Sequence, residues 1–143
     1  MGGRSRRDAS GAARLILVDT SAWVEFLRDT GSPVCRKVDD LIDGPIATCY
    51  PVRMEVLAGA RDERHLNELR RLLARASLLP IRATDFEEGA AFYRTCRRGG
   101  ETVRRIMDCL IAAIAVRNGV PVLHADADFE ALARQTPLQT EPV

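Results

Sequence analysis

The feature that most constrains the fold is the alternation of short, mainly apolar runs with longer segments that carry helix signals. The first run, Leu15–Val18, is unbroken, and comparable runs follow at residues 46–49, 78–81 and 121–124. Strands that are buried on both faces have such continuous runs, whereas half-exposed strands alternate apolar and polar residues. The sequence therefore predicts an α/β fold, in which an open parallel sheet of about four to five strands is sandwiched by helices.

Helix start and stop signals lie between these runs. Ser32 can cap a helix that has Pro33 at its first position and ends at Gly44, and Thr84 and Glu87 form a capping box for a later helix. The predicted helices cover residues 21–28, 33–43, 51–57, 62–75, 84–97, 101–118 and 129–134.

The length of 143 residues suits one domain. Residues 1–14 are polar, basic and rich in Gly and Ser, so we expect a disordered lead-in or a cloning remnant, followed by a single domain at 15–143. No secretion signal and no apolar run of membrane-spanning length is apparent, which predicts a cytoplasmic protein with no membrane partner. In a reducing cytosol the four cysteines are expected to be free thiols: Cys35, Cys49, Cys96 and Cys109.

The choice of arginine over lysine says more about a possible ligand than the net charge of +1 does. Of 21 basic residues, only Lys37 is a lysine. Arginine binds phosphate groups with two parallel hydrogen bonds and stacks on bases, so this bias favours a nucleic-acid ligand. A compositional bias of the genome explains the same numbers without any ligand, and both interpretations stay open here.

Acidic side chains follow the predicted strands at the edge where parallel sheets bind ligands. Asp19 follows the first strand, Asp126 and Asp128 follow the fourth, and Glu55 lies one turn into the helix after the second strand. Asp108 stands inside the long helix, directly before eight apolar residues, so it is expected to be largely buried.

Each acid also has an ordinary structural explanation. Asp19 could cap a helix, Asp126 and Asp128 could form a turn, and Asp108 could pair with Arg104 or Arg105 one turn earlier. Together, however, carboxylates from four separate elements would repel one another unless divalent cations or raised pKa values stabilise them. Ligands that are all oxygen atoms favour Mg²⁺ or Mn²⁺ over zinc.

Other chemistries lack the residues they need. Only two histidines occur, His65 and His124, so a Ser or Cys triad is poorly supported, and neither a GxGxxG nor a GxxxxGK[ST] motif is present. Metal-assisted hydrolysis of a phosphodiester remains.

Three segments carry a resemblance to a known family. The segments "LILVDTSAWVEFL", "PVRMEVLAGA" and "ETVRRIMDCLIAAIAVRNGVPVLHADADFEALA" resemble the PIN domain and, more closely, the VapC ribonuclease toxins of bacterial toxin–antitoxin pairs. The resemblance covers the chain from about Leu15 onward. It implies a PIN-like sheet and a Mg²⁺- or Mn²⁺-dependent endoribonuclease that acts on structured RNA, tRNA or rRNA. It also implies a homodimer and a VapB-type antitoxin that inserts a segment near the active site.

The same resemblance implies roles for individual residues. The catalytic acids would be Asp19, Glu55, Asp108 and Asp126, of which Asp19, Asp108 and Asp126 would hold the metal. Asp128 is a second candidate for the fourth place. Thr20 and Ser21 match hydroxyls that support the first acid, and Met107 departs from the polar residue that relatives often carry before the third acid.

Two alternatives remain at this stage. A phosphoryl-transfer protein with a catalytic Asp after its first strand would need a lysine after a late strand or a D-x-D motif, whereas Lys37 is misplaced and Asp19 is followed by Thr20 and Ser21. A non-catalytic RNA- or protein-binding module would not require the acids to converge. Trp23 and Phe26 could form an apolar surface for the antitoxin or a second subunit, or could belong to the core.

Overall fold

The sheet predicted from the apolar runs is present and is parallel throughout. The computed structural model describes residues 14–143, so the predicted lead-in, apart from Arg14, lies outside the described residues. Strands β1 (Ile16–Val18), β2 (Ile46–Thr48), β3 (Ser77–Leu78) and β4 (Val122–Leu123) form a four-stranded sheet in the order β3-β2-β1-β4. All three strand pairs are parallel, which confirms the predicted fold class.

The two central strands are buried because both faces of the sheet are covered. In the register, Ile16 pairs with Ile46, and Leu17 pairs with both Ala47 and Val122. Leu17 has no exposed surface. Continuous apolar runs are therefore the correct sequence for these strands, since no side of them faces water.

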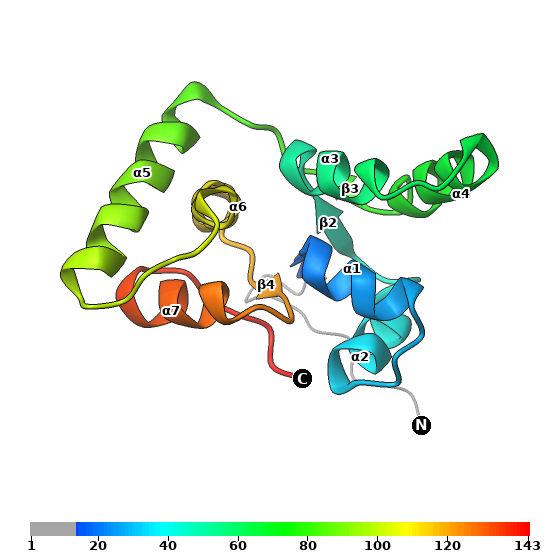
Figure 1. The fold of residues 1–143 in the computed structure, drawn as a ribbon, viewed down its shortest axis with the longest axis horizontal. Coiled ribbons are helices and arrows are strands. Elements are labelled where there is room, and N and C mark those ends of the chain that lie inside the picture. The colour runs from blue at the N-terminus through cyan, green and yellow to red at the C-terminus, as the bar shows by residue number, and fades with distance from the viewer. Residues whose placement is uncertain (1–13) are drawn as a thin grey trace.

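Seven helices within residues 14–143 surround the sheet. Figure 1 shows them in two groups, α1 to α4 at one side and α5 to α7 at the other, with β4 between the groups. Their bounds are α1 Thr20–Leu27, α2 Pro33–Leu41, α3 Tyr50–Ala58, α4 Glu63–Leu73, α5 Ala83–Arg98, α6 Ile106–Asn118 and α7 Ala127–Gln135. None of the described helices is long and apolar enough to cross a membrane.

Helix α6 is the centre of one layer. Its residues from Asp108 to Ala115 are buried without interruption, and Gly119 ends it with a left-handed φ of 64°. The prediction that it begins at Glu101 is wrong, because α6 begins at Ile106. The reason is a competing interaction: the backbone N–H groups of Arg104 and Arg105 bind the carboxylate of Asp128 and hold this stretch outside the helix.

The start of α5 also differs from the sequence prediction. The capping box of Thr84 and Glu87 does not form. Instead, the helix starts at Ala83, and the carboxylate of Asp85 accepts the backbone N–H of Arg82 at 2.8 Å. By contrast, Ser32 caps α2 as predicted, by accepting the N–H of Cys35 at 3.0 Å.

Of the aromatic pair on α1, Trp23 belongs to the interior and Phe26 is partly buried against the core. Trp23 has no exposed surface and contacts Phe26 edge to face, with ring centroids 6.2 Å apart. The hypothesis that Trp23 forms a partner surface is therefore wrong, and its alternative, a core residue, is confirmed. The four cysteines are free, as expected, and the structure places all of them in the interior.

Candidate active site

Asp19 lies at the carboxyl end of β1 and caps α1. Its Oδ2 accepts hydrogen bonds from the backbone N–H and the hydroxyl of Ser21, at 2.9 and 2.6 Å. The Ser21 hydroxyl oxygen also accepts the N–H of Ala125, which ties the ends of β1 and β4 together. The Oδ1 of Asp19 is buried and has no hydrogen-bond partner among the described residues. Burial raises the pKa of Asp19, although the Ser21 hydrogen bonds oppose this.

Asp108 lies in the first turn of α6 and is 1% exposed. Burial is the largest cause that raises its pKa to about 8, followed by the nearby charge of Asp19 and the carboxyl group of Asp128. The alternative that Asp108 pairs with a preceding arginine is wrong. Arg105 binds Glu55, and the Arg104 side chain comes within 3.9 Å of Asp128.

Asp126 and Asp128 shape the loop that follows β4. Asp126 caps α7 and accepts the N–H of Asp128 at 2.9 Å, and its own N–H donates to Nδ1 of His124 at 3.1 Å. The two carboxylate oxygens of Asp128 accept the backbone N–H groups of Arg104 and Arg105, each at 3.0 Å. Asp128 thus joins the start of α7 to the segment that leads into α6.

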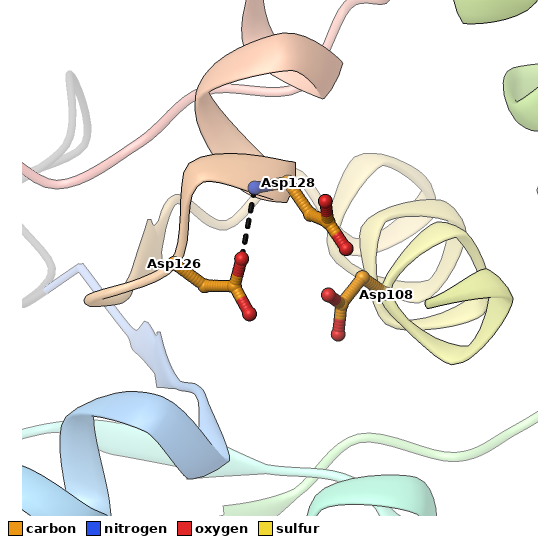
Figure 2. A group of neighbouring side chains, drawn as sticks. All are labelled: Asp108, Asp126 and Asp128. Carbon is orange, nitrogen blue, oxygen red and sulfur yellow. Dashed lines mark hydrogen bonds between the residues drawn. The ribbon is translucent and has the colours of Figure 1, made fainter. Parts of the chain in front are cut away.

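Three of these carboxylates form one cluster. Figure 2 shows Asp126 and Asp128, at the start of α7, and Asp108, on α6, reaching toward one another. One oxygen from each lies within 4.8 Å of the others. Asp19 is near enough to raise the pKa of Asp108, so the structure brings the first acid to the same end of the sheet.

The donor set suits a divalent cation. Oδ1 of Asp19 and Oδ2 of Asp108 are buried and lack a hydrogen-bond partner within residues 14–143. A buried carboxylate oxygen without a partner is costly, and a bound cation would compensate for that cost. Oxygen ligands of this kind match the preference of Mg²⁺ and Mn²⁺.

Glu55 reaches the site from α3 but stands apart from the cluster of three aspartates. It forms an ion pair with Arg105, and its Oε1 is buried without a partner among the described residues. This pair was not predicted from the sequence, and no local pattern signals it, because the two residues lie far apart along the chain. The hydroxyl of Thr20, next to Asp19, is likewise buried and unpartnered in the described part of the chain.

A groove leads from this edge of the sheet across α1, α3 and α4. It has a volume of about 490 Å³, and its lining includes Thr20 and Glu55, together with Val24, Leu27, Arg28, Val56, Gly59, Arg61, His65, Glu68 and Leu69. The groove therefore reaches Glu55 and Thr20, the neighbour of Asp19, and offers both apolar and charged groups to a ligand.

The lysine that a phosphoryl-transfer site with a catalytic Asp would need is absent from this edge. Lys37 pairs with Glu141 at 3.5 Å, and Glu141 lines a small pocket with Ile16 and Pro121, at the amino ends of β1 and β4. The single lysine of the chain thus lies at the opposite edge of the sheet from Asp19.

The chain matches known proteins over nearly its whole length. The model of the PIN domain family matches residues 16–135. "Ribonuclease VapC11" of Mycobacterium tuberculosis is 48% identical over 129 residues, covering 87% of this chain and 96% of that protein. "Ribonuclease VapC51" of the same organism is 31% identical over 121 residues, covering 84% and 86%.

Solved structures of other proteins share the fold of this chain. The structure of VapBC2 from Rickettsia felis bound to a promoter DNA fragment superposes with a TM-score of 0.71 at 17% identity, covering 89% of this chain and 97% of that chain. VapBC-1 from nontypeable Haemophilus influenzae gives a TM-score of 0.70 at 16% identity, covering 89% and 96%. The family model and the 48% relative show that the chain belongs to the VapC family of PIN-domain proteins.

Proposed function

We propose that the chain is a metal-dependent endoribonuclease that hydrolyses phosphodiester bonds in structured RNA, tRNA or rRNA, as the toxin of a toxin–antitoxin pair in the cytoplasm. The observation that carries the proposal is the buried acidic cluster at the carboxyl edge of the sheet, with unpartnered oxygens on Asp19 and Asp108. The membership in the VapC family and the name of the 48% relative, a ribonuclease, support the reaction class.

The residues divide into two roles. Asp19, Asp108 and Asp126 would hold Mg²⁺ or Mn²⁺, and Asp128 would fix the loop that presents Asp108, since both of its oxygens bind that loop's backbone. A bound divalent cation would polarise the phosphate and lower the pKa of a water molecule. Glu55, whose Oε1 is free of hydrogen bonds in the described structure, would accept a proton from the attacking water.

The proposed partners correspond to two surfaces. A VapB-type antitoxin that reaches the active site would occupy the 490 Å³ groove, because this groove includes Glu55 and Thr20. A second copy of the chain would cover the apolar surface formed by Tyr50, Met54 and Phe86, whose exposed fractions are 55%, 57% and 58%. These side chains line a hollow of about 450 Å³ between α3, α5 and α6. Aromatic and methionine side chains are typical of interface centres.

The test is RNA cleavage by the purified protein. Total tRNA and rRNA are incubated with the protein in Mg²⁺, in Mn²⁺ and in EDTA, and the products are mapped by sequencing. We expect discrete cuts that require the divalent cation and that disappear in Asp108→Asn. Cleavage that persists in EDTA, or that survives in a folded Asp108→Asn variant, would contradict the proposal.

A further inference from the structure

Arg105 contacts two of the acidic residues through different parts of itself. Its backbone N–H donates to Oδ2 of Asp128 at 3.0 Å, while its guanidinium group forms an ion pair with Glu55. Asp128 lies on α7 and Glu55 on α3, so Arg105 connects α3 to the start of α7. Its positive charge also acts on Asp108, whose pKa it lowers against the other causes.

The ion pair restricts Glu55. The side chain of Glu55 is only 16% exposed, one of its oxygens is bound by Arg105, and the other is buried without a partner in the described residues. A glutamate on a helix has several rotamers of similar energy. A guanidinium group that is itself anchored at its backbone selects one of them and leaves a single carboxylate oxygen without a hydrogen bond.

Arg104 provides the contrast within the same segment. Its backbone N–H binds Oδ1 of Asp128 in the same way, at 3.0 Å. Its side chain, however, is 76% exposed and comes no closer than 3.9 Å to an acid, whereas that of Arg105 is 50% exposed and makes a direct ion pair. The two neighbours thus share their backbone contact and differ in what the side chain does.

We propose that Arg105 is the positioning residue and internal counter-ion of Glu55. The inference rests on the proposed function, in which Glu55 takes part in RNA hydrolysis. The Arg105 guanidinium holds Oε2 of Glu55, so that Oε1 faces the reacting atoms, and it neutralises one negative charge beside the metal ligands. It acts on the reaction through Glu55 and makes no contact with the substrate.

If Arg105 has this role, Arg105→Gln should lower kcat and at the same time raise the affinity for Mn²⁺. Without its fixed orientation Glu55 is a poorer proton acceptor, so kcat should fall by about tenfold to a hundredfold while KM changes little. Without the positive charge, the acids should bind Mn²⁺ about threefold to tenfold more tightly. A variant that simply disturbs the fold would weaken both properties. Arg105→Lys keeps the charge and should restore the Mn²⁺ affinity of the wild type and part of kcat.

The experiment combines Mn²⁺ calorimetry with steady-state RNA cleavage on the full chain. The variants are Arg105→Gln, Arg105→Lys, Glu55→Gln and the double variant Glu55→Gln/Arg105→Gln. Because Arg105 acts through Glu55, the double variant should cleave no more slowly than Glu55→Gln alone. Arg104→Gln is the matched control for a lost arginine and should change Mn²⁺ affinity less than Arg105→Gln, because its charge is more exposed.

Three results would overturn the proposal. A raised KM at unchanged kcat in Arg105→Gln would make Arg105 a contact to RNA. A double variant far slower than Glu55→Gln would show that Arg105 acts independently of Glu55. Mn²⁺ affinity that is unchanged or weaker in Arg105→Gln would exclude the counter-ion role. Failure of the proposed function is seen separately, as a wild-type protein that does not cleave RNA, and the Mn²⁺ titration then still decides the counter-ion role.

Discussion

Asp108 and Asp128 bring carboxylate oxygens within 4.8 Å of each other from two different helices. The two carboxylates differ in the hydrogen bonds that they accept. Asp128 accepts two backbone N–H groups, whereas Oδ2 of Asp108 has no partner within residues 14–143. The fold thus supplies hydrogen-bond donors to both oxygens of Asp128 and leaves one oxygen of Asp108 dependent on a proton or a cation.

This inequality predicts how the stability of the metal-free protein depends on pH. Burial raises the pKa of Asp108 from its ordinary 3.8 to about 8, so between these values the folded state holds a proton that the unfolded state has lost. The contribution of Asp108 to stability is therefore complete below about pH 4 and is lost as the pH rises toward 8, with a slope of at most about 1.4 kcal/mol per pH unit.

Urea unfolding in EDTA between pH 5 and 8 measures this slope. Asp108→Asn cannot titrate and should show a flatter profile than the wild type, with its gain in stability largest near pH 8. Identical profiles for the two proteins would mean that Asp108 is ionised in the folded state without metal.

The acids should act as one unit in RNA cleavage. Asp19→Asn and Asp108→Asn each remove one charged ligand without changing side-chain size, and each should lower kcat by about a hundredfold or more. The double variant should be little worse than either single variant, because both disable the same site. Circular dichroism should show native helix content in all three. Effects that multiply in the double variant would indicate two independent sites.

Local patterns were sufficient for the order of the helices and strands and for the convergence of the four aspartates. Continuous apolar runs followed by Asp19 and Asp126 located the strand ends, and parallel topology then placed these acids at one edge. The start of α6 was not predictable in this way, because Asp128 holds Arg104 and Arg105 from a segment more than twenty residues away. The predicted capping box of α5 was wrong for the same reason, because Arg117, far along the chain, binds Asp85 and fixes it at the start of the helix. Long-range polar contacts leave no periodic pattern in a sequence.

The ion pair of Arg117 and Asp85 should be a large contribution to stability. Nε and Nη2 of Arg117 donate to the two carboxylate oxygens at 2.7 and 2.9 Å, and the Asp85 side chain is 3% exposed. The Arg117 guanidinium holds the pKa of Asp85 below its usual range. This part of the stability is therefore present above about pH 4 and is lost as the pH falls through the lowered pKa.

Arg117→Met should lower the free energy of unfolding by about 2–4 kcal/mol, because it leaves a buried carboxylate without its partner. The control is Arg75→Met, since Arg75 pairs with Asp43 at 3.0 Å but both side chains are more than half exposed. That change should cost less than about 1 kcal/mol. Urea unfolding at pH 7 compares the two variants, and equal losses would contradict the prediction.

Gly89 permits the close approach of α5 to α6. A Cβ atom at this position would lie 3.2 Å from the backbone N and Cα of Leu110. Gly89→Ala should therefore destabilise the protein by about 1–3 kcal/mol, despite the higher helix propensity of alanine. At the exposed neighbour Ala90, the reverse change to glycine should cost only about 1 kcal/mol, through propensity alone. Stabilisation by Gly89→Ala would show that the helices can separate freely.

The exposed apolar surface on α3 and α5 should mediate self-association. Phe86 is 58% exposed and lines the 450 Å³ hollow with Met54 and Leu57. Phe86→Glu places a charge where a second copy would bury it, so this variant should be monomeric in light scattering at concentrations where the wild type is a dimer. Leu27→Glu is the control: Leu27 is 43% exposed but lines the groove beside Glu55, so the change should leave the dimer intact and weaken antitoxin binding. If Phe86→Glu stays dimeric while Leu27→Glu dissociates, the groove, and not this surface, is the site of self-association.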